Sequence, residues 1–145
     1  HCISSAASDV YKRQALEYAV KILRVKDIIV MGHAHCGGVA ALCKSINNDK
    51  KGEAKHNPND FIKSWVDIAK PALSKIDFDH NDANIEVNSE RAVVLYSYSN
   101  LLTYPWLKDA VSKNFLEIHA WWLDFKSVML WKKAQGSDSF IPMDF

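Results

Sequence analysis

Two side chains that can bind a metal lie close together in this sequence. His33 and Cys36 form a His-x-x-Cys pair. Imidazole and thiolate are ligands that Zn²⁺ favours, and this spacing lets both side chains converge on one ion from a single turn. Such pairs are also frequent by chance, so the spacing alone leaves open a buried histidine beside an inert cysteine.

The elements on either side of this pair favour a site. Residues 27–31 are an apolar, β-branched run without alternation, which is typical of a strand covered on both faces in a parallel sheet. The glycine pair after Cys36 begins a predicted helix over 38–46. His33 and Cys36 therefore lie where a strand ends, the edge at which α/β sheets build sites, and the helix dipole there favours a thiolate.

The remaining periodicities complete an α/β pattern. An amphipathic helix is predicted over 15–24, where apolar residues recur at three and four. The other predicted elements are a polar loop over 47–60, a helix over 61–73, a helix within 81–103 that ends before Pro105, a short helix over 106–113, a strand over 115–123, a turn over 124–127 and a strand over 128–131. We expect a mostly parallel central sheet flanked by helices, with a C-terminal edge hairpin.

Residues 1–14 differ in character from the rest of the chain. They are rich in serine and alanine, show no clear period, and contain the stretch SDVYKRQ, which resembles translated adapter remnants at the ends of assembled environmental genes. We expect a poorly ordered tail foreign to the fold, followed by a domain over 15–145. The alternative is a native N-terminal arm.

Composition excludes several classes of protein. The chain has 145 residues, enough for about one domain, with 48% hydrophobic and 24% charged residues, which indicates a globular protein. Its 18 basic and 17 acidic residues give a net charge of +1, which argues against nucleic-acid binding. No apolar run suits a membrane helix, and three cysteines are too few for a disulfide framework. We expect a soluble, cytoplasmic protein.

Several stretches, in order along the chain, resemble the β-class carbonic anhydrases. The strongest is Gly-His-x-x-Cys-Gly, which in that family is a zinc-binding turn delivered by a strand. The similarity extends over roughly 15–131. The matching stretches are 16–20, 28–39, 61–65, 70–72, 100–106 and 116–121.

The resemblance implies a zinc ion held by two cysteines and one histidine, of which His33 and Cys36 match the histidine and the second cysteine. Such an ion lowers the pKa of bound water towards ~7, so that hydroxide can attack CO₂ and give bicarbonate. Gly37 and Gly38 match the glycines beside the ligand cysteine, where missing side chains let the backbone approach substrate; otherwise they serve only as a helix entry. The family also implies a homodimer or a higher homo-oligomer.

One family motif is missing. The first zinc cysteine of the family lies in an upstream Cys-x-Asp-x-Arg motif, whose Asp–Arg pair orients the zinc-bound group, and this sequence has no such motif. We therefore assign no catalytic residue and expect an inactive, N-terminally truncated fragment. Cys2 lacks the motif's context, and Cys43 lies ~10 Å beyond Cys36 along a helix, too far to share an ion and better suited to the core.

The other histidines and the tryptophans show weaker signals of a role in the site. His35 could relay protons or could simply be solvated, and His119 suits packing or hydrogen bonding. We assign no role to His56 or His80. The tryptophans suit a core or a subunit interface: 65, 106, 121, 122 and 131.

Three alternatives to a carbonate dehydratase remain open from sequence. The same fold and metal could hydrolyse COS or CS₂. A non-catalytic zinc-binding or assembly subunit could retain His33 and Cys36 without the rest of the site. A plain α/β domain would bind no metal at all.

Overall fold

The chain folds into two compact units. The computed structural model describes residues 4–52, 66–78 and 84–144, with side chains from Arg13 onward. One unit comprises His1–Ile28 and Leu101–Ile118, and the other comprises Ile29–Asn100 and His119–Phe145. The second unit contains the His-x-x-Cys turn.

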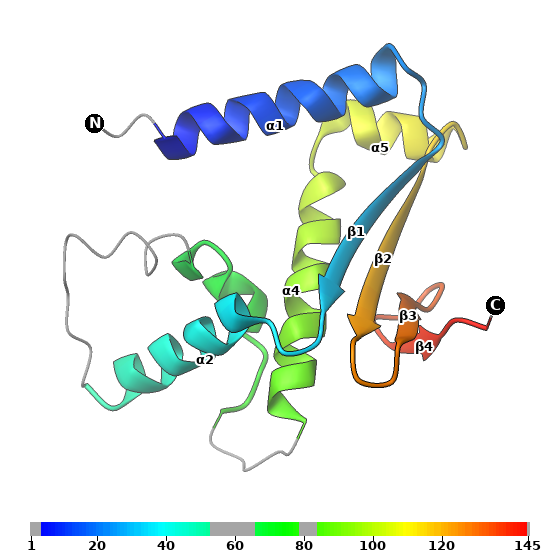
Figure 1. Ribbon diagram of the computed structural model, residues 1–145. Coiled ribbons are helices and arrows are strands. Elements are labelled where there is room, and N and C mark those ends of the chain that lie inside the picture. Colours follow the sequence, from blue (N-terminus) through cyan, green and yellow to red (C-terminus); the bar gives the residue numbers. More distant parts are fainter. Residues whose placement is uncertain (1–3, 53–65, 79–83, 145) are drawn as a thin grey trace. The chain divides into compact units, whose positions relative to one another are not determined.

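Two helices dominate the first unit: α1 over Ser4–Lys21 and α5 over Pro105–Ser112 (Figure 1). Proline suits the first turn of α5 because an N–H there has no helical partner to lose. The ammonium of Lys21 lies 5.7 Å from the centre of the Trp106 ring, which joins the two helices. The helix predicted over 15–24 is thus present but begins earlier and ends earlier.

The prediction that residues 1–14 lack regular structure is wrong for those that are described. Residues 4–14 are helical and continuous with the predicted helix. The sequence signal was weak there because serine, alanine and charged residues give a helix little amphipathic pattern. Whether SDVYKRQ is native sequence stays an open prediction.

The described strands are β1 over Asp27–His33, β2 over Glu117–Asp124, β3 over Met129–Lys133 and β4 over Phe140–Pro142. They form a four-stranded sheet in the order β1-β2-β3-β4. Near one end of the first two strands, Glu117 donates its N–H to the carbonyl of Lys26, and near the other end Ala34 donates to Leu123. Both strands therefore run in the same direction, as their arrows show in Figure 1. The other two pairs are antiparallel, so the described sheet is mixed, and the expectation of a mostly parallel sheet is wrong because the C-terminal hairpin and β4 add antiparallel strands.

The predicted α/β class and the C-terminal hairpin are confirmed, with one change at the edge. Trp122 of β2 pairs with Trp131 of β3, as a hairpin requires. β3 is not the edge strand, however, because Lys132 pairs in turn with Ile141 of β4. A three-residue strand that ends in Pro142 carries almost no sequence signal, and proline is tolerated at a sheet edge.

The second unit also holds α2 over Gly37–Lys50, a 3₁₀ turn over Lys70–Leu73 and most of α4, which spans Ile85–Leu101. The loop predicted over 47–60 is wrong for 47–50, which continue α2. The helix predicted over 61–73 lies partly outside the described residues, and its last part is the 3₁₀ turn.

Two apolar clusters fix the elements around the turn. In the first, Val94 of α4 packs with Ala34, Trp122 and Phe140, so the helix covers the sheet. In the second, Leu42 of α2 packs with two residues: Val66 and Leu73. Since the turn lies between β1 and α2, both of its ends are anchored. None of the described helices is long and apolar enough to cross a membrane.

Candidate functional site

The structure places His33 and Cys36 at the two ends of one short turn. His33 is the last residue of β1, and Cys36 is the N-cap residue of α2. Cys36 has extended backbone angles, φ −69° and ψ 111°, which are ordinary for this position. The predicted position of the pair, at a strand end and a helix N-terminus, is confirmed.

The His33 ring has one nitrogen engaged. Its Nδ1 lies 2.9 Å from the carbonyl oxygen of Ala34. A carbonyl can only accept, so Nδ1 carries the hydrogen, and in neutral imidazole Nε2 is then left with a lone pair. The Phe125 ring lies 5.2 Å from the imidazole ring, centre to centre. His33 is thus oriented as metal-binding histidines commonly are, with the second nitrogen held by a hydrogen bond.

The Cys36 backbone is held by a residue far away in the chain. Its N–H donates to Oε1 of Glu90 at 3.0 Å, and the indole N–H of Trp122 donates to Oε2 of the same carboxylate at 3.1 Å. Glu90 is only 5% exposed. The Cys36 side chain makes no capping hydrogen bond, so its sulfur is not engaged in starting the helix.

Gly32 is required by packing just before the turn. A Cβ built at Gly32 would lie 2.3 Å from Cγ2 of Val94, a distance that no real contact allows. A Cβ at Gly37, by contrast, would meet nothing within 4 Å. The first glycine therefore lets α4 approach β1, whereas the second leaves open space beside the candidate ligand.

His35 has a backbone role in the turn. Its φ is 54°, in the left-handed region that non-glycine residues seldom adopt. This conformation turns the chain from β1 towards α2 and leaves the residue exposed. A role for its imidazole in proton relay stays a prediction.

Cys43 is a packed thiol, as predicted. It lies against the second apolar cluster. Burial raises the pKa of the Cys43 thiol, and the Ser89 hydroxyl opposes this to a smaller extent. Cys43 is therefore protonated at neutral pH, unlike a metal ligand.

The donor set at the turn suits zinc but is incomplete among the described residues. Imidazole nitrogen and thiolate sulfur are zinc ligands. His33 uses Nδ1 for the bond to Ala34, which leaves Nε2 as the nitrogen for a metal, and the Cys36 sulfur does not cap the helix. Within the described part of the chain, no third histidine, cysteine or carboxylate forms a close group with His33 and Cys36. Cys2, His56 and His80 lie outside the described residues.

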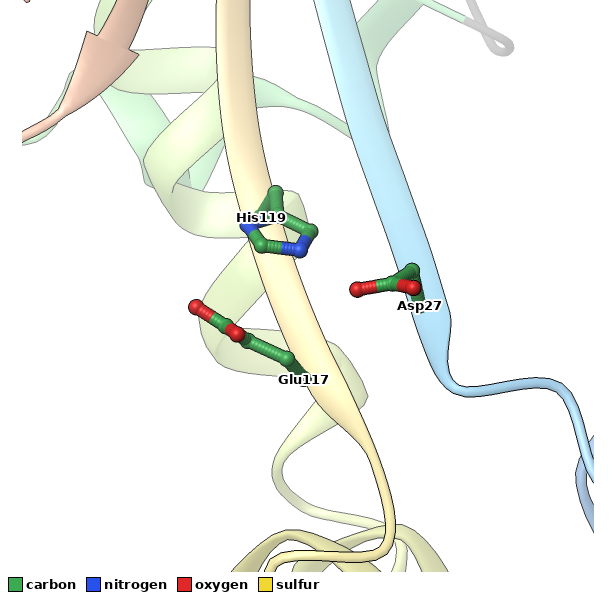
Figure 2. Close-up of side chains that lie close together, drawn as sticks. All are labelled: Asp27, Glu117 and His119. Carbon is green, nitrogen blue, oxygen red and sulfur yellow. The ribbon is translucent and has the colours of Figure 1, made fainter.

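Other side chains that can bind metals lie at the starts of two strands. Figure 2 shows Asp27 on β1 and Glu117 and His119 on β2. Carboxylate oxygens of Asp27 and Glu117, both in the first unit, lie within 4.8 Å of each other. His119 belongs to the second unit, and its ring lies 5.9 Å from that of Trp121, which agrees with the predicted packing role. All three polar residues also make other interactions, so we assign no metal to them.

Two of the tryptophans lie in the core of the second unit, as predicted. Trp122 is buried in the first apolar cluster, and Trp131 packs against it. Their rings lie 6.5 Å apart in an edge-to-face arrangement. Trp65 lies outside the described residues.

Sequence reasoning missed Glu90. The sequence pattern predicts a helix within 81–103 but assigns no role to Glu90, which lies inside α4. A glutamate on the buried face of a helix is the signal that could have marked it, because such carboxylates are rarely buried without partners. The identity of its partners depends on tertiary structure.

Comparisons with known proteins agree on one family. A family model described as carbonic anhydrase matches residues 3–130. Beta carbonic anhydrase 3 of Arabidopsis thaliana is 34% identical over 128 residues, covering 78% of this chain and 48% of that protein. The mitochondrial beta carbonic anhydrase 6 of the same plant is 34% identical over 131 residues, covering 86% of this chain and 42% of that protein.

Solved structures show the same fold. The β-carbonic anhydrase CcaA superposes with a TM-score of 0.72 at 20% identity, covering 90% of this chain and 62% of that one. A tetrameric β-carbonic anhydrase from Sordaria macrospora gives 0.68 at 20% identity, covering 89% and 61%. The chain spans about half the length of the curated relatives it matches.

Proposed function

Because this chain belongs to the β-class carbonic anhydrase family, we propose that it forms part of an enzyme that reversibly hydrates CO₂ to bicarbonate, with a zinc ion held in part by His33 and Cys36. The observation that carries the proposal is the turn itself. It presents an imidazole whose Nδ1, not Nε2, is held by the Ala34 carbonyl, and a cysteine whose sulfur is not used for helix capping.

The residues of the turn have distinct roles in this proposal. His33 binds through Nε2, and its bond to the Ala34 carbonyl fixes the ring orientation. Cys36 binds as thiolate at the start of α2, where the helix dipole favours negative charge. A zinc ion, when bound, supplies Lewis acidity that makes water a nucleophile near neutral pH.

Gly37 leaves room for substrate, and we propose that Gly38 lies beside the same space. No atom would contact a Cβ at Gly37, so the backbone beside Cys36 is open to a small molecule. CO₂ is small and apolar, and bicarbonate is a small anion suited to backbone N–H groups at a helix start. We propose that both occupy this space.

The site needs groups that the described residues do not supply. Catalytic zinc sites have three protein ligands, and the turn offers two. We propose that the third ligand and an Asp–Arg pair, both expected from the family, come from sequence outside this chain. Alone, the chain is then an inactive part of the enzyme.

The test is to read the source DNA in frame upstream of residue 1 and assay the complete product. An upstream Cys-x-Asp-x-Arg segment and CO₂ hydration that is lost in Cys36→Ser support the proposal. A complete product with that segment but no hydration contradicts it. Sulfide release from COS or CS₂ without CO₂ hydration assigns the related hydrolase reaction instead.

One observation favours a second candidate, a non-catalytic zinc-binding subunit. The turn offers only two ligands within the described part of the chain, which suits a site shared with another chain. Tight zinc binding by the complete product, without any hydration, identifies this case.

We also propose that the protein assembles as a homo-oligomer. The Sordaria macrospora relative is tetrameric. In this chain Phe125 and Val128, at the β2–β3 turn, are 57% and 82% exposed, and apolar side chains of this size favour burial in an interface. Light scattering of the complete product tests this. A cytoplasmic location stays a prediction.

A further inference from the structure

The strongest unassigned feature near the turn is the buried carboxylate of Glu90. One oxygen accepts the backbone N–H of Cys36, and the other accepts the indole N–H of Trp122. Ionised groups this far from solvent are retained only where their hydrogen bonds are satisfied. Here each oxygen has one donor, and the two donors lie on different elements.

The bond to Cys36 replaces a local cap that the sequence cannot form. In a capping box, the backbone N–H of the N-cap residue is bound by a glutamate or glutamine three positions later. In α2 that position is Val39, which has no acceptor. Glu90 supplies the acceptor from α4, 54 positions away in the chain.

In this arrangement the Cys36 sulfur takes no part in capping the helix. The usual N-cap side chain accepts hydrogen bonds from the helix, which would engage the Cys36 sulfur. Here the sulfur makes no such bond, and the backbone of Cys36 is fixed by Glu90 instead. Trp122, 3% exposed in the core, holds the other oxygen and so keeps the carboxylate in place.

We propose that Glu90 is a positioning residue that fixes Cys36 for metal binding; the inference rests on the proposed role of Cys36 as a zinc ligand. It acts through the peptide N–H and does not contact the metal. Residues that orient metal ligands typically change metal affinity 10- to 100-fold when they are replaced.

Glu90→Gln is the informative variant. Glutamine has nearly the same volume but only one acceptor oxygen, so its NH₂ group must face either Cys36 or Trp122, both of which are donors. One of the two hydrogen bonds is therefore lost, and the one that remains has a neutral acceptor in place of a charged one, so the bond to Cys36 is broken or weakened in either orientation. Glu86→Gln is the matched control, since it makes the same chemical change at an exposed position of the same helix.

The first measurement needs no metal. Amide hydrogen exchange of the 145-residue chain, followed residue by residue, reports the Cys36 N–H directly. Hydrogen bonds to charged groups are worth ~1.5–3 kcal/mol, so in Glu90→Gln we expect exchange at Cys36 to accelerate about tenfold or more. Amides in the middle of α2 should keep their rates, and Glu86→Gln should match the unmodified chain.

The second measurement uses Co²⁺ as the probe. The absorption band from thiolate to cobalt reports whether Cys36 is a ligand, and its titration gives an affinity. We expect affinity to fall at least about tenfold in Glu90→Gln and to stay constant in Glu86→Gln. Leu73→Ala, in the second apolar cluster, controls for destabilisation alone and should leave the band unchanged.

Two results would overturn the proposed role of Glu90. Exchange at Cys36 that is no faster in Glu90→Gln than in Glu86→Gln overturns the proposal, as does cobalt affinity that falls equally in Leu73→Ala. Absence of a cobalt band in the unmodified chain counts against zinc binding and leaves the exchange result to judge Glu90. If Glu90→Gln does not fold, Cys36 exchange in the unmodified chain decides, because rates as fast as those of exposed amides exclude the hydrogen bond.

Discussion

Some residues around the turn carry a signal in their own short stretch of sequence, and others depend on residues far away in the chain. Only the roles of the first kind could be predicted from the sequence. His33 and Cys36 are close in sequence and carry their own chemical signal, so their position in the fold was predictable. Glu90 was not, because its partner Cys36 is 54 positions away. Gly32 could be predicted only in part. Its place in the Gly-His-x-x-Cys-Gly motif is visible in the sequence, but the need for glycine there comes from Val94 on another element.

Replacing Gly32 with alanine should destabilise the protein by packing alone. The added Cβ would lie 2.3 Å from Cγ2 of Val94, a stiff side chain that is 3% exposed and cannot move away easily. We expect a loss of about 1–3 kcal/mol in the free energy of unfolding, measured by urea denaturation. Gly37→Ala is the control, because nothing lies near its Cβ, and it should change stability little.

A double variant tests the cause. Val94→Ala removes the clashing methyl groups, so adding Gly32→Ala to it should cost much less than adding it to the unmodified chain. Equal costs in both backgrounds would show that Val94 is not the obstacle.

At the scale of elements, α4 is the helix that connects the parts of the second unit. Through Glu90 it reaches the turn, and through Arg91 it reaches three strands. The Arg91 guanidinium lies 4.4 Å from the ring centre of Trp122, 4.7 Å from Trp131 and 5.5 Å from Phe140. Sequence periodicity predicted this helix but not its partners, since β4 was not predicted.

Arg91→Ala should loosen the attachment of α4 to the sheet. Cation–π contacts contribute from about 0.5 kcal/mol each when exposed to ~2 kcal/mol when desolvated. We expect the free energy of unfolding to fall by about 2 kcal/mol in urea denaturation. Lys132→Ala, an exposed cation on β3, should change it by less than about 0.5 kcal/mol. An Arg91→Ala effect no larger than that of Lys132→Ala would mean that the ring contacts do not stabilise the unit.

The β2–β3 hairpin should weaken in acid. The Ser127 hydroxyl, together with the N–H of Lys126, lowers the pKa of Asp124 from its ordinary value of 3.8. A lowered folded-state pKa means that the stabilisation is complete above the unfolded pKa and is lost as pH falls through the folded one. We expect the free energy of unfolding to decrease below about pH 4, and to decrease less in Ser127→Ala, which removes the largest cause.

Urea denaturation between pH 7 and pH 3 measures this difference. Ser97→Ala, an exposed serine on α4, is the control and should follow the unmodified chain. Parallel curves for Ser127→Ala and the unmodified chain would rule out a contribution from the hydrogen bond between Ser127 and Asp124.

At the scale of the whole molecule, family and fold class were predictable because several motifs occur in a fixed order. Sequence resemblance extended over 15–131, and the family model matches residues 3–130. The wrong expectation for residues 4–14 arose because a helix without an amphipathic pattern looks like an unstructured tail. The third zinc ligand that the family implies is a different matter, since the described residues bring no third candidate ligand to the turn and so offer no pattern from which to predict one.

The 145-residue chain alone should hydrate CO₂ no faster than buffer. A catalytic zinc site needs three protein ligands to hold the ion with an open position, and the described residues bring only His33 and Cys36 to the turn. Stopped-flow assay with a pH indicator measures the rate, and metal analysis measures zinc. We expect weak zinc binding that His33→Ala abolishes and that Cys43→Ser, at the packed thiol, leaves unchanged. Rapid hydration by this chain would contradict the prediction, because it would require a third ligand from residues 1–3, from the other undescribed segments or from a second copy of the chain.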